Sequence, residues 1–591
     1  MRNRWSLALV IVLGAFAMLC ASYRPFFCDD AFISLRYADR LLHGHGLTWT
    51  DGEPVEGYSN FLWVLLCASL GALGIDLVVA ARVLGVVLEL GAIAAILRIA
   101  FDRVAAPAVG VLAVAFFALS APVAVWTIGG LEQPLQAALL AWSLVFLLRA
   151  AHAPQPRERD LSLAGVSLAA LALTRPDGVV FAVATLPLLR DRATRTTRAL
   201  PLLLPTAIAV TAQTAFRMAY YGDIVPNTAH VKLALTATRL LQGLGYAAHG
   251  CAAAACLLVL LWLGRRAARG PMLVVASPLA AWLVYVIAIG GDSLPAHRHF
   301  VPVLLLLAIA LIELRRGAPS TSRTDAIAWL CLVGFVAMQH VDPDATYVRT
   351  ERWEWEGRTL GRILQTALGA QHPTIALDPA GAVPFYAGLP AIDMLGLSDR
   401  HIATHESEGF GKGFVGHERG DGDYVLRQTP DLVLFCHPAG SLAPCFRSGR
   451  EMVRDARFRR SYRPVVIANE RPALRSVIFA RVDRGPLGAR ATTEGFVVPA
   501  LAFADGAPSV ARLDAETHGL VLHLEANRRA QLERVAFLPG HGWTGMVRGA
   551  SASVDVRVLV AAPLDGAATH TIELSSDRDT DVSEVVLVRA R

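Results

Sequence analysis

The sequence predicts a polytopic α-helical membrane protein whose second half is polar and mixed in secondary structure. Hydrophobic residues make up 54% and charged residues only 18% of the 591 positions, whereas a soluble chain carries about 25% charge. Apolar runs recur up to about residue 341 and then give way to a polar region. The formal net charge of +6 comes from short basic segments between apolar runs, so we expect no nucleic-acid partner.

Eleven apolar runs approach or reach the length that crosses a bilayer core, about 20 residues for a helix. They occupy 6–22, 77–97, 104–124, 132–149, 161–174, 177–189, 199–219, 244–263, 271–290, 300–314 and 325–341. The runs 161–174 and 177–189 could instead form one broken hairpin. The first run follows a basic start, as in a signal peptide. We interpret it as an uncleaved first helix, with cleavage at Ala15-Phe16-Ala17 as the alternative.

Basic residues concentrate in every second connection, which is typical of cytoplasmic loops. These connections contain Arg2, Arg4, Arg98, Arg103, Arg157, Arg159, Arg190, Arg192, Arg195, Arg198, Arg265, Arg266, Arg269, Arg315, Arg316 and Arg323. The alternation predicts a cytoplasmic N-terminus, and eleven crossings place everything after about residue 342 outside the cytoplasm. It requires that SNFLWVLLCASLGALG (59–74) lies at the surface, like the amphipathic helix expected over 30–43.

The polar half divides in two, so we expect three domains: a transmembrane domain over 1–342, an extracytoplasmic α/β domain over 343–485 and a β-rich domain over 486–591. The middle part alternates short apolar strands (TIALD, DLVLF, PVVIA) with helical stretches. Period-two runs such as ASVDVRVLVAAP predict a β-sandwich-like end, which could bind carbohydrate. Outside the cytoplasm Cys436 and Cys445 could form a disulfide, with two free thiols as the alternative.

Acids and cations from five outer loops fall on one side of the membrane in this topology. They are Asp29, Asp30, Arg36, Glu132, Arg175, Asp177, Asp223, Asn227, His230, Lys232, Asp292, His297, Arg298 and His299. Charges at the bilayer rim are costly unless paired or used, so the set indicates a composite site for an anionic ligand carried by the membrane. Ordinary loop polarity is the alternative, and Asp30 also suits a helix N-cap. Cysteines and histidines show no metal-site spacing, and HGHG (43–46) suits a helix end.

Such a site suits a donor that is activated by a lipid phosphate. Arginine and lysine would bind the phosphate and stabilise its departure, while a carboxylate would take the proton from an incoming hydroxyl. A soluble nucleotide donor would need a nucleotide-binding motif, and the sequence contains no Walker loop or dinucleotide fingerprint.

Eight stretches within residues 1–440 carry a family resemblance. They are DDAFISLRYADRLLHGHGLTW, EGYSNFLW, GGLEQPL, LTRPDG, YYGDIVPNTAHVK, GGDSLPAHRHFVPVL, DPAGAVPFYAGLPAIDMLGLSDRHIA and GHERGDGDYVLRQTPDLVLF. In combination they resemble the GT-C superfamily of polyprenyl-phosphate-sugar-dependent membrane glycosyltransferases. The nearest likeness is to bacterial enzymes similar to the mycobacterial terminal β-(1→2)-arabinofuranosyltransferase. The 486–591 segment carries no such resemblance.

The resemblance implies an inverting, single-displacement transfer in which the acid just after the first span acts as general base. By position this role falls on Asp29, with Asp30 as cap or support. The donor-phosphate candidates are Arg175, Lys232 and Arg298, followed by His230 and His297. The acceptor or substrate candidates are Glu132, Arg36, Asn227 and Asp292. The acids neither require nor exclude a divalent metal, and we expect no other cofactor.

The expected function is therefore transfer of a sugar, with arabinofuranose as the candidate, from a polyprenyl-phosphate donor to a hydroxyl of a cell-envelope glycan or glycolipid. The expected location is the outer face of a bacterial inner membrane, with the C-terminal region periplasmic. The alternatives are a transporter or flippase, and an envelope protein that binds glycan structurally. Rim charges gathered on one face, rather than at the midplane, argue against transport.

Overall fold

The computed structural model divides the chain into two compact units. It describes residues 2–102, 106–153, 157–189, 195–264, 272–315, 322–483, 488, 490–491, 495–499, 509–513, 520–524, 529–535, 543–548, 556–561 and 570–589. The helical unit comprises Met1–Trp49, Pro54–Arg352 and Glu408–Gly416, and the C-terminal unit comprises Thr50–Glu53, Trp353–Ser407 and His417–Arg591. The expected three-domain division stays a prediction.

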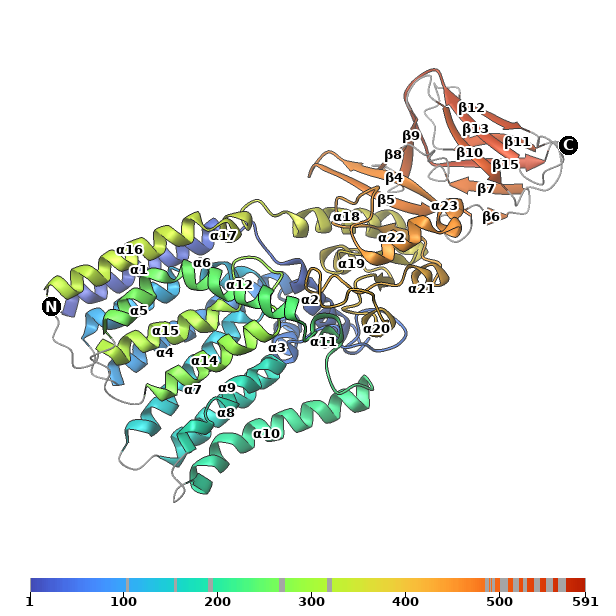
Figure 1. The fold of residues 1–591 in the computed structure, drawn as a ribbon. Coiled ribbons are helices and arrows are strands. Elements are labelled where there is room, and N and C mark those ends of the chain that lie inside the picture. Colours follow the sequence, from blue (N-terminus) through green and yellow to red (C-terminus); the bar gives the residue numbers. More distant parts are fainter. Residues whose placement is uncertain are drawn as a thin grey trace. The chain divides into compact units, whose positions relative to one another are not determined.

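The helical unit contains a bundle of apolar helices and several short ones (Figure 1). Its elements are α1 (Arg2–Ser22), α2 (Asp29–Leu42), α3 (Phe61–Gly71), α4 (Leu77–Asp102), α5 (Pro107–Ala118), α6 (Ala121–Ile128), α7 (Gln133–His152), α8 (Glu158–Thr174), η1 (Pro176–Gly178), α9 (Val179–Val183), η2 (Leu186–Leu189), α10 (Arg195–Tyr220), α11 (Asn227–Lys232), α12 (Ala237–Ala253), α13 (Ala255–Gly264), α14 (Leu273–Ala288), α15 (Phe300–Arg315), α16 (Ser322–Val341) and α17 (Pro343–Tyr347).

Four helices within the described residues are long and apolar enough to cross a membrane: α1 from Arg4, α4, α7, and α10 from Arg198. Two bent pairs bring the number to six: α5 with α6, bent by 63°, and α12 with α13, bent by 72°. The chain is thus a polytopic helical membrane protein. Helices or helical turns lie over all eleven expected runs, but α14 and α15 have only 16 residues each, so the number eleven stays a prediction.

Small residues let the long helices pack closely. A Cβ on Gly85 of α4 would lie 2.0 Å from the backbone oxygen of Thr127, and one on Gly165 of α8 would lie 2.4 Å from that of Pro201 in α10. Helices approach this closely in membranes where glycine leaves the backbone uncovered. Helices α4, α7, α8 and α10 consequently contact one another in sequence along the bundle.

The two helices expected at the membrane surface are present as α2 and α3. Helix α3 has 11 residues, about 16 Å at 1.5 Å per residue, too short to cross a core of about 30 Å. Helix α2 buries Ala31 to Ala38. Several of the loop arginines behind the topology prediction lie outside the described residues: Arg103, Arg190, Arg192, Arg265, Arg266, Arg269 and Arg316.

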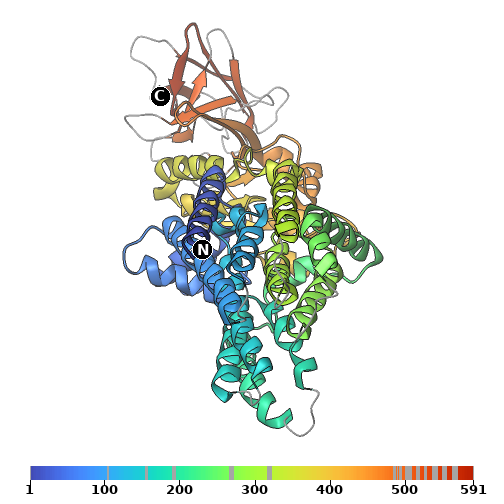
Figure 2. The ribbon, with the colours of Figure 1, turned by 90° about the vertical axis from the view of Figure 1, so that its left-hand side faces the viewer.

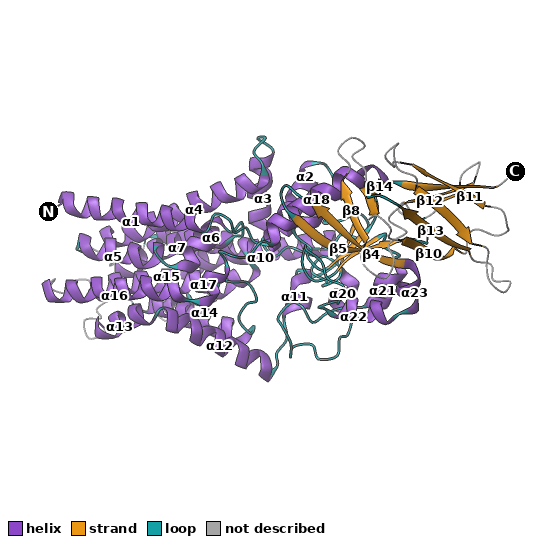
Figure 3. Ribbon diagram, turned by 90° about the horizontal axis from the view of Figure 1, so that it is seen from above, coloured by secondary structure: helices purple, strands orange, loops and turns teal. Residues whose placement is uncertain are grey.

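The C-terminal unit is built on an eight-stranded sheet with the order β14-β9-β8-β4-β5-β3-β1-β2. Figure 3 draws the strands of this unit in orange and its helices in purple. Its helices are α18 (Trp353–Leu368), η4 (Gly369–Gln371), α19 (Ala382–Ala387), α20 (Arg400–Thr404), α21 (Gly422–Arg427), α22 (Arg447–Arg454) and α23 (Ala456–Ser461). The strands are β1 (Ile375–Leu377), β2 (Ala391–Asp393), β3 (Leu432–Leu434), β4 (Tyr462–Asn469), β5 (Leu474–Arg481), β6 (Arg490–Ala491), β7 (Gly495–Pro499), β8 (Ser509–Leu513), β9 (Leu520–Leu524), β10 (Arg529–Val535), β11 (Trp543–Arg548), β12 (Val556–Ala561), β13 (His570–Ser576), β14 (Thr580–Val582) and β15 (Glu584–Arg589).

Strand β1 pairs in parallel with both β2 and β3, and β3 pairs antiparallel with β5. Val433, Phe435, Met452 and Phe458 lie in the core between this sheet and its helices. Two smaller sheets follow, β10-β13-β12 and β11-β15-β7-β6, drawn in orange to red (Figure 2). A disulfide joins Cys436 and Cys445, which selects one of the two alternatives for this pair.

Candidate active site

A cavity of about 210 Å³ opens in the helical unit where several loops meet. Arg175 and Asp177 reach it from the turn after α8, Lys232 from α11, and Asp292 and Arg298 from the loop before α15. The structure therefore brings together charged groups that are distant in the sequence. Three cations line one small cavity, as a site for an anion requires.

Arg298 forms an ion pair with Asp292, and both side chains are buried. Burial by itself raises the pKa of Asp292, but the charges on Arg298, His299 and Lys232 outweigh it and lower that pKa to about 2. Burial lowers the pKa of His299 to about 4, because its attraction to Asp292 is weaker than desolvation and the nearby arginines. At neutral pH the pair is charged and His299 is neutral.

Arg175 lies at the centre of a second buried network. Its guanidinium pairs with Glu132 and with Asp177, whose Oδ2 is 2.7 Å from Arg175 Nη2. Tyr285 Oη donates to Asp177 Oδ2 at 2.8 Å, and Asn60 Nδ2 donates to Glu132 Oε2 at 2.7 Å. Two carboxylates already neutralise Arg175, so it is better suited to hold Glu132 and Asp177 in place than to provide spare positive charge.

The acidic pair begins helix α2. Cys28 occupies the N-cap position, and Asp29 and Asp30 both lie in the first turn. The expectation that Asp30 caps this helix is therefore wrong, because the helix begins at Asp29, two residues before the Ala31 start that this cap requires. Asp30 Oδ2 instead lies 3.9 Å from Lys232 Nζ, one of the cations of the cavity, and both side chains are partly exposed. Carboxylates at a helix N-terminus are also favoured by the helix dipole.

Other sequence candidates lie away from the cavity lining. Arg36 donates Nε to the Trp49 carbonyl oxygen at 2.5 Å and stacks over the Trp49 ring. His230 pairs with Asp223 at 2.8 Å. The backbone N–H of Asn227 donates to the backbone carbonyl oxygen of Glu56 at 3.0 Å. These contacts stabilise the surrounding loops.

His297, a candidate for binding the donor phosphate, is directed toward two carboxylates instead of the cavity. Its Nε2 lies 3.7 Å from Asp342 and 3.8 Å from Asp344, and its ring packs 4.6 Å from that of His249. Sequence spacing gave no sign of this cluster, since its members come from widely separated segments.

Sequence reasoning also missed several parts of the site. Tyr285 is an isolated tyrosine in the apolar helix α14, and Asn60 precedes the apolar helix α3. The segment 408–416 belongs to the helical unit, where Val415 lines the cavity and Thr236 Oγ1 donates to the Gly411 oxygen at 2.6 Å. A glycine-rich stretch predicts a loop but does not show where the loop packs.

A family model described as "Domain of unknown function (DUF8728)" matches residues 345–481. No curated protein matches the chain by sequence. The match therefore covers a segment of the polar half, and of the described cavity-lining residues it includes only Val415.

Several solved structures are similar to the chain. ArnT from Cupriavidus metallidurans bound to undecaprenyl phosphate is 14% identical, with 66% of this chain and 86% of that one covered and a TM-score of 0.47. Arabinofuranosyltransferase AftD from Mycobacteria is 14% identical over 100% of this chain and 61% of that one, with a TM-score of 0.40. The archaeal oligosaccharyltransferase AglB from Archaeoglobus fulgidus, in complex with an inhibitory peptide and a dolichol-phosphate, is 12% identical over 66% and 64%, with a TM-score of 0.39.

Proposed function

We propose that the chain is an inverting glycosyltransferase that moves a sugar from a polyprenyl-phosphate donor to a hydroxyl of a cell-envelope glycan or glycolipid. The observation that carries this proposal is the cavity lined by Lys232 and Arg298, because Lys232 Nζ also lies 3.9 Å from Asp30 at the acidic start of α2. Buried cations suit a phosphate that leaves with negative charge, and a nearby carboxylate suits proton removal. The motif resemblance in residues 1–440 supports the same reaction.

Lys232 and Arg298 are the cations that we assign to the donor phosphate. Among the residues that the structure describes, the ion pair of Lys232 is a partly exposed contact with Asp30 at 3.9 Å, so its ammonium can turn toward a ligand. Arg298 lines the cavity while Asp292 fixes its guanidinium. Arg175 acts through Glu132 and Asp177 as a positioning residue. His230 would assist only indirectly, through helix α11, which carries both His230 and Lys232.

Asp29 is the general base in this proposal, and Asp30 supports the donor side through Lys232. The acceptor hydroxyl oxygen attacks the anomeric carbon while the bond from that carbon to the phosphate oxygen breaks. The bonding electrons leave with the polyprenyl phosphate, and the hydroxyl proton passes to the Asp29 carboxylate. Attack opposite the leaving group inverts the anomeric configuration.

The acceptor would enter near Glu132 and Asp292, and arabinofuranose is the sugar that the resemblance suggests. We further propose a bacterial inner-membrane location with a cytoplasmic N-terminus and a periplasmic C-terminal unit, as the loop charges indicate. The 486–591 segment would bind glycan. A reporter fused after residue 345 should be active only outside the cytoplasm, and activity confined to the cytosol would overturn this orientation.

Purified full-length protein incubated with a panel of polyprenyl-phosphate sugars tests the reaction. We expect one donor to release polyprenyl phosphate, and a nucleotide sugar to remain intact. Asp29→Asn should lower turnover by about 10²–10⁴-fold with donor binding retained, whereas Asp30→Asn should mainly weaken donor binding. If a folded wild-type protein turns over no lipid-linked sugar, or Asp29→Asn keeps full turnover, the assignment fails. Lipid-linked sugar moved across a liposome membrane without bond cleavage would favour the flippase alternative.

A further inference from the structure

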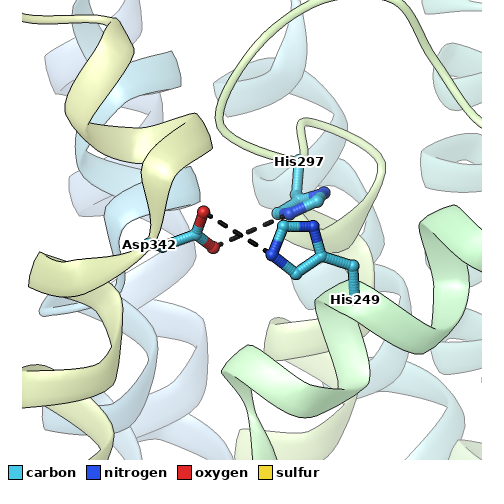
Figure 4. Close-up of side chains that lie close together, drawn as sticks. All are labelled: His249, His297 and Asp342. Atoms are coloured by element: carbon cyan, nitrogen blue, oxygen red, sulfur yellow. Dashed lines mark ion pairs between the residues drawn. The ribbon is translucent and has the colours of Figure 1, made fainter.

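Three side chains from distant segments converge at one side of the helical unit (Figure 4). They are His249 of α12, His297 of the loop before α15, and Asp342, which caps α17. One nitrogen or oxygen atom of each lies within 4.8 Å of the others. Asp342 Oδ2 is 3.7 Å from His297 Nε2, and Asp342 Oδ1 is 3.8 Å from His249 Nε2. We call these residues the histidine cluster.

His297 is the buried centre of the histidine cluster. Its residue is only 5% exposed, yet neither ring nitrogen makes a hydrogen bond in the described part of the structure. A buried polar group without a hydrogen bond costs free energy, typically about 1–3 kcal/mol. The carboxylates at 3.7 and 3.8 Å are too far for hydrogen bonds but close enough to share a small ligand with the ring.

The chemistry of these groups selects the ligand. Two imidazoles and a carboxylate form a donor set that zinc-class ions favour, whereas magnesium and calcium prefer oxygen ligands alone. Ligands at about 2.0–2.1 Å around a tetrahedral zinc lie about 3.3–3.4 Å from one another. The observed separations of 3.7 and 3.8 Å, each to a different oxygen of Asp342, and the limit of 4.8 Å among the three ligand atoms are wider than that spacing, so the ion would draw the side chains together.

We propose that His249, His297 and Asp342 bind one zinc-class divalent ion, separate from the candidate active site. Asp344 Oδ2, 3.8 Å from His297 Nε2, would supply the fourth ligand. The ion would tie α12, the loop before α15 and the start of α17 together. Because His297 directly precedes Arg298, the bound ion would also fix the backbone beside the cavity. Binding of the ion does not depend on the proposed function.

A second group of two histidines and an acid, in the C-terminal unit, provides an internal control. His401 Nε2 lies 2.7 Å from Asp421, and its ring stacks on Tyr424 at 4.0 Å. Asp421 also accepts a hydrogen bond from the Tyr424 backbone. His401 and Asp421 thus satisfy each other without an ion, and the second histidine, His405, lies 3.6 Å from Asp421 and is exposed. The proposal therefore assigns no metal to this group.

Metal content of the full-length protein tests the proposal directly. The protein would be purified without a polyhistidine tag, stripped with a chelator, incubated with zinc, desalted and measured by mass spectrometry. We expect one equivalent per chain in the wild type and in His401→Ala, and its loss in His249→Ala and Asp342→Asn. The His249 side chain is 50% exposed, so its removal leaves packing intact. Equal zinc in wild type and folded His249→Ala would overturn the proposal.

Cobalt spectroscopy adds a test based on a gained signal. Cobalt(II) bound to the folded His249→Cys variant should show a thiolate-to-metal charge-transfer absorption, because the new sulfur would ligate the ion. Wild type and His401→Cys should lack this band. Its absence in folded His249→Cys, or its equal presence in His401→Cys, would contradict the assignment.

Discussion

The cavity and the histidine cluster share the loop before α15 but differ in how their polar groups are paired. In the cavity, Arg298 is already paired with Asp292, and Lys232 faces Asp30. In the histidine cluster, two buried ring nitrogens of His297 have no hydrogen bond among the described residues. Asp292 fixes the Arg298 guanidinium at the cavity, and the partly exposed ammonium of Lys232 can exchange its carboxylate contact for an anion. An imidazole nitrogen without a hydrogen bond is instead suited to a cation. Adjacent residues of one loop can thus serve two different ligands.

The largest effect should come from removing the cation of the buried pair. Arg298→Gln leaves Asp292 charged and buried without its partner, which typically costs about 3–5 kcal/mol. Thermal unfolding of the full-length protein measures the loss. The double variant Asp292→Asn with Arg298→Gln should recover much of the stability while donor binding stays weak. A single variant as stable as the wild type would show that the pair is not a coupled unit.

The histidine cluster should raise the thermal stability of the protein only when zinc is present. Zinc at about 100 times its dissociation constant should stabilise the wild type by about 2.7 kcal/mol. His297→Ala should not respond, because its buried ligand is gone. Thermal unfolding of the wild type and of His297→Ala without zinc measures the effect of the substitution on packing alone. An equal zinc-dependent rise in the stability of His297→Ala would show that zinc does not bind through His297.

These contrasts show how far the sequence predicts the site. The membrane character could be predicted, because apolar runs are a local property of the chain. Arg175, Lys232 and Arg298 line one cavity, while their assignment to a donor phosphate stays a prediction. The partners of Arg175 and the direction of His297 could not be predicted, because they depend on packing between distant segments. A shift of two residues in the start of α2 made Cys28 rather than Asp30 the N-cap.

A buried acid without a cation extends the comparison to the C-terminal unit. Burial raises the pKa of Asp378 to about 7, in contrast to about 2 for Asp292 beside Arg298. The folded state therefore keeps the Asp378 proton between about pH 4 and 7, where the unfolded state has lost it. Stability should fall as pH rises through this range and level off above it.

The variant Asp378→Asn stays neutral at every pH and tests this assignment. The difference in unfolding free energy between the variant and the wild type should shift by roughly 1–3 kcal/mol in favour of the variant from pH 4 to pH 8. Thermal unfolding of both proteins at the two pH values provides the measurement, with Asp76→Asn as an exposed control. Parallel pH profiles for wild type and Asp378→Asn would show that a different group titrates.

The smallest effect on stability should come from Lys232, whose contact with Asp30 is partly exposed. Lys232→Ala should change stability by less than about 1 kcal/mol. It should nevertheless weaken donor binding by about tenfold, the loss of one charge-assisted contact of about 1.4 kcal/mol. Lys232→Arg keeps the charge and should retain more affinity. Unchanged donor affinity in Lys232→Ala would remove this residue from the phosphate site.

The anomeric configuration of the transferred sugar tests the central claim most directly. Wild-type protein and Asp29→Asn would be reconstituted in liposomes with the donor that the panel identifies and an acceptor glycan, and the product examined by NMR. We predict that the wild type transfers the sugar with inversion and that Asp29→Asn transfers almost none. Retained configuration in the product, or equal transfer by Asp29→Asn, would contradict single displacement with Asp29 as base.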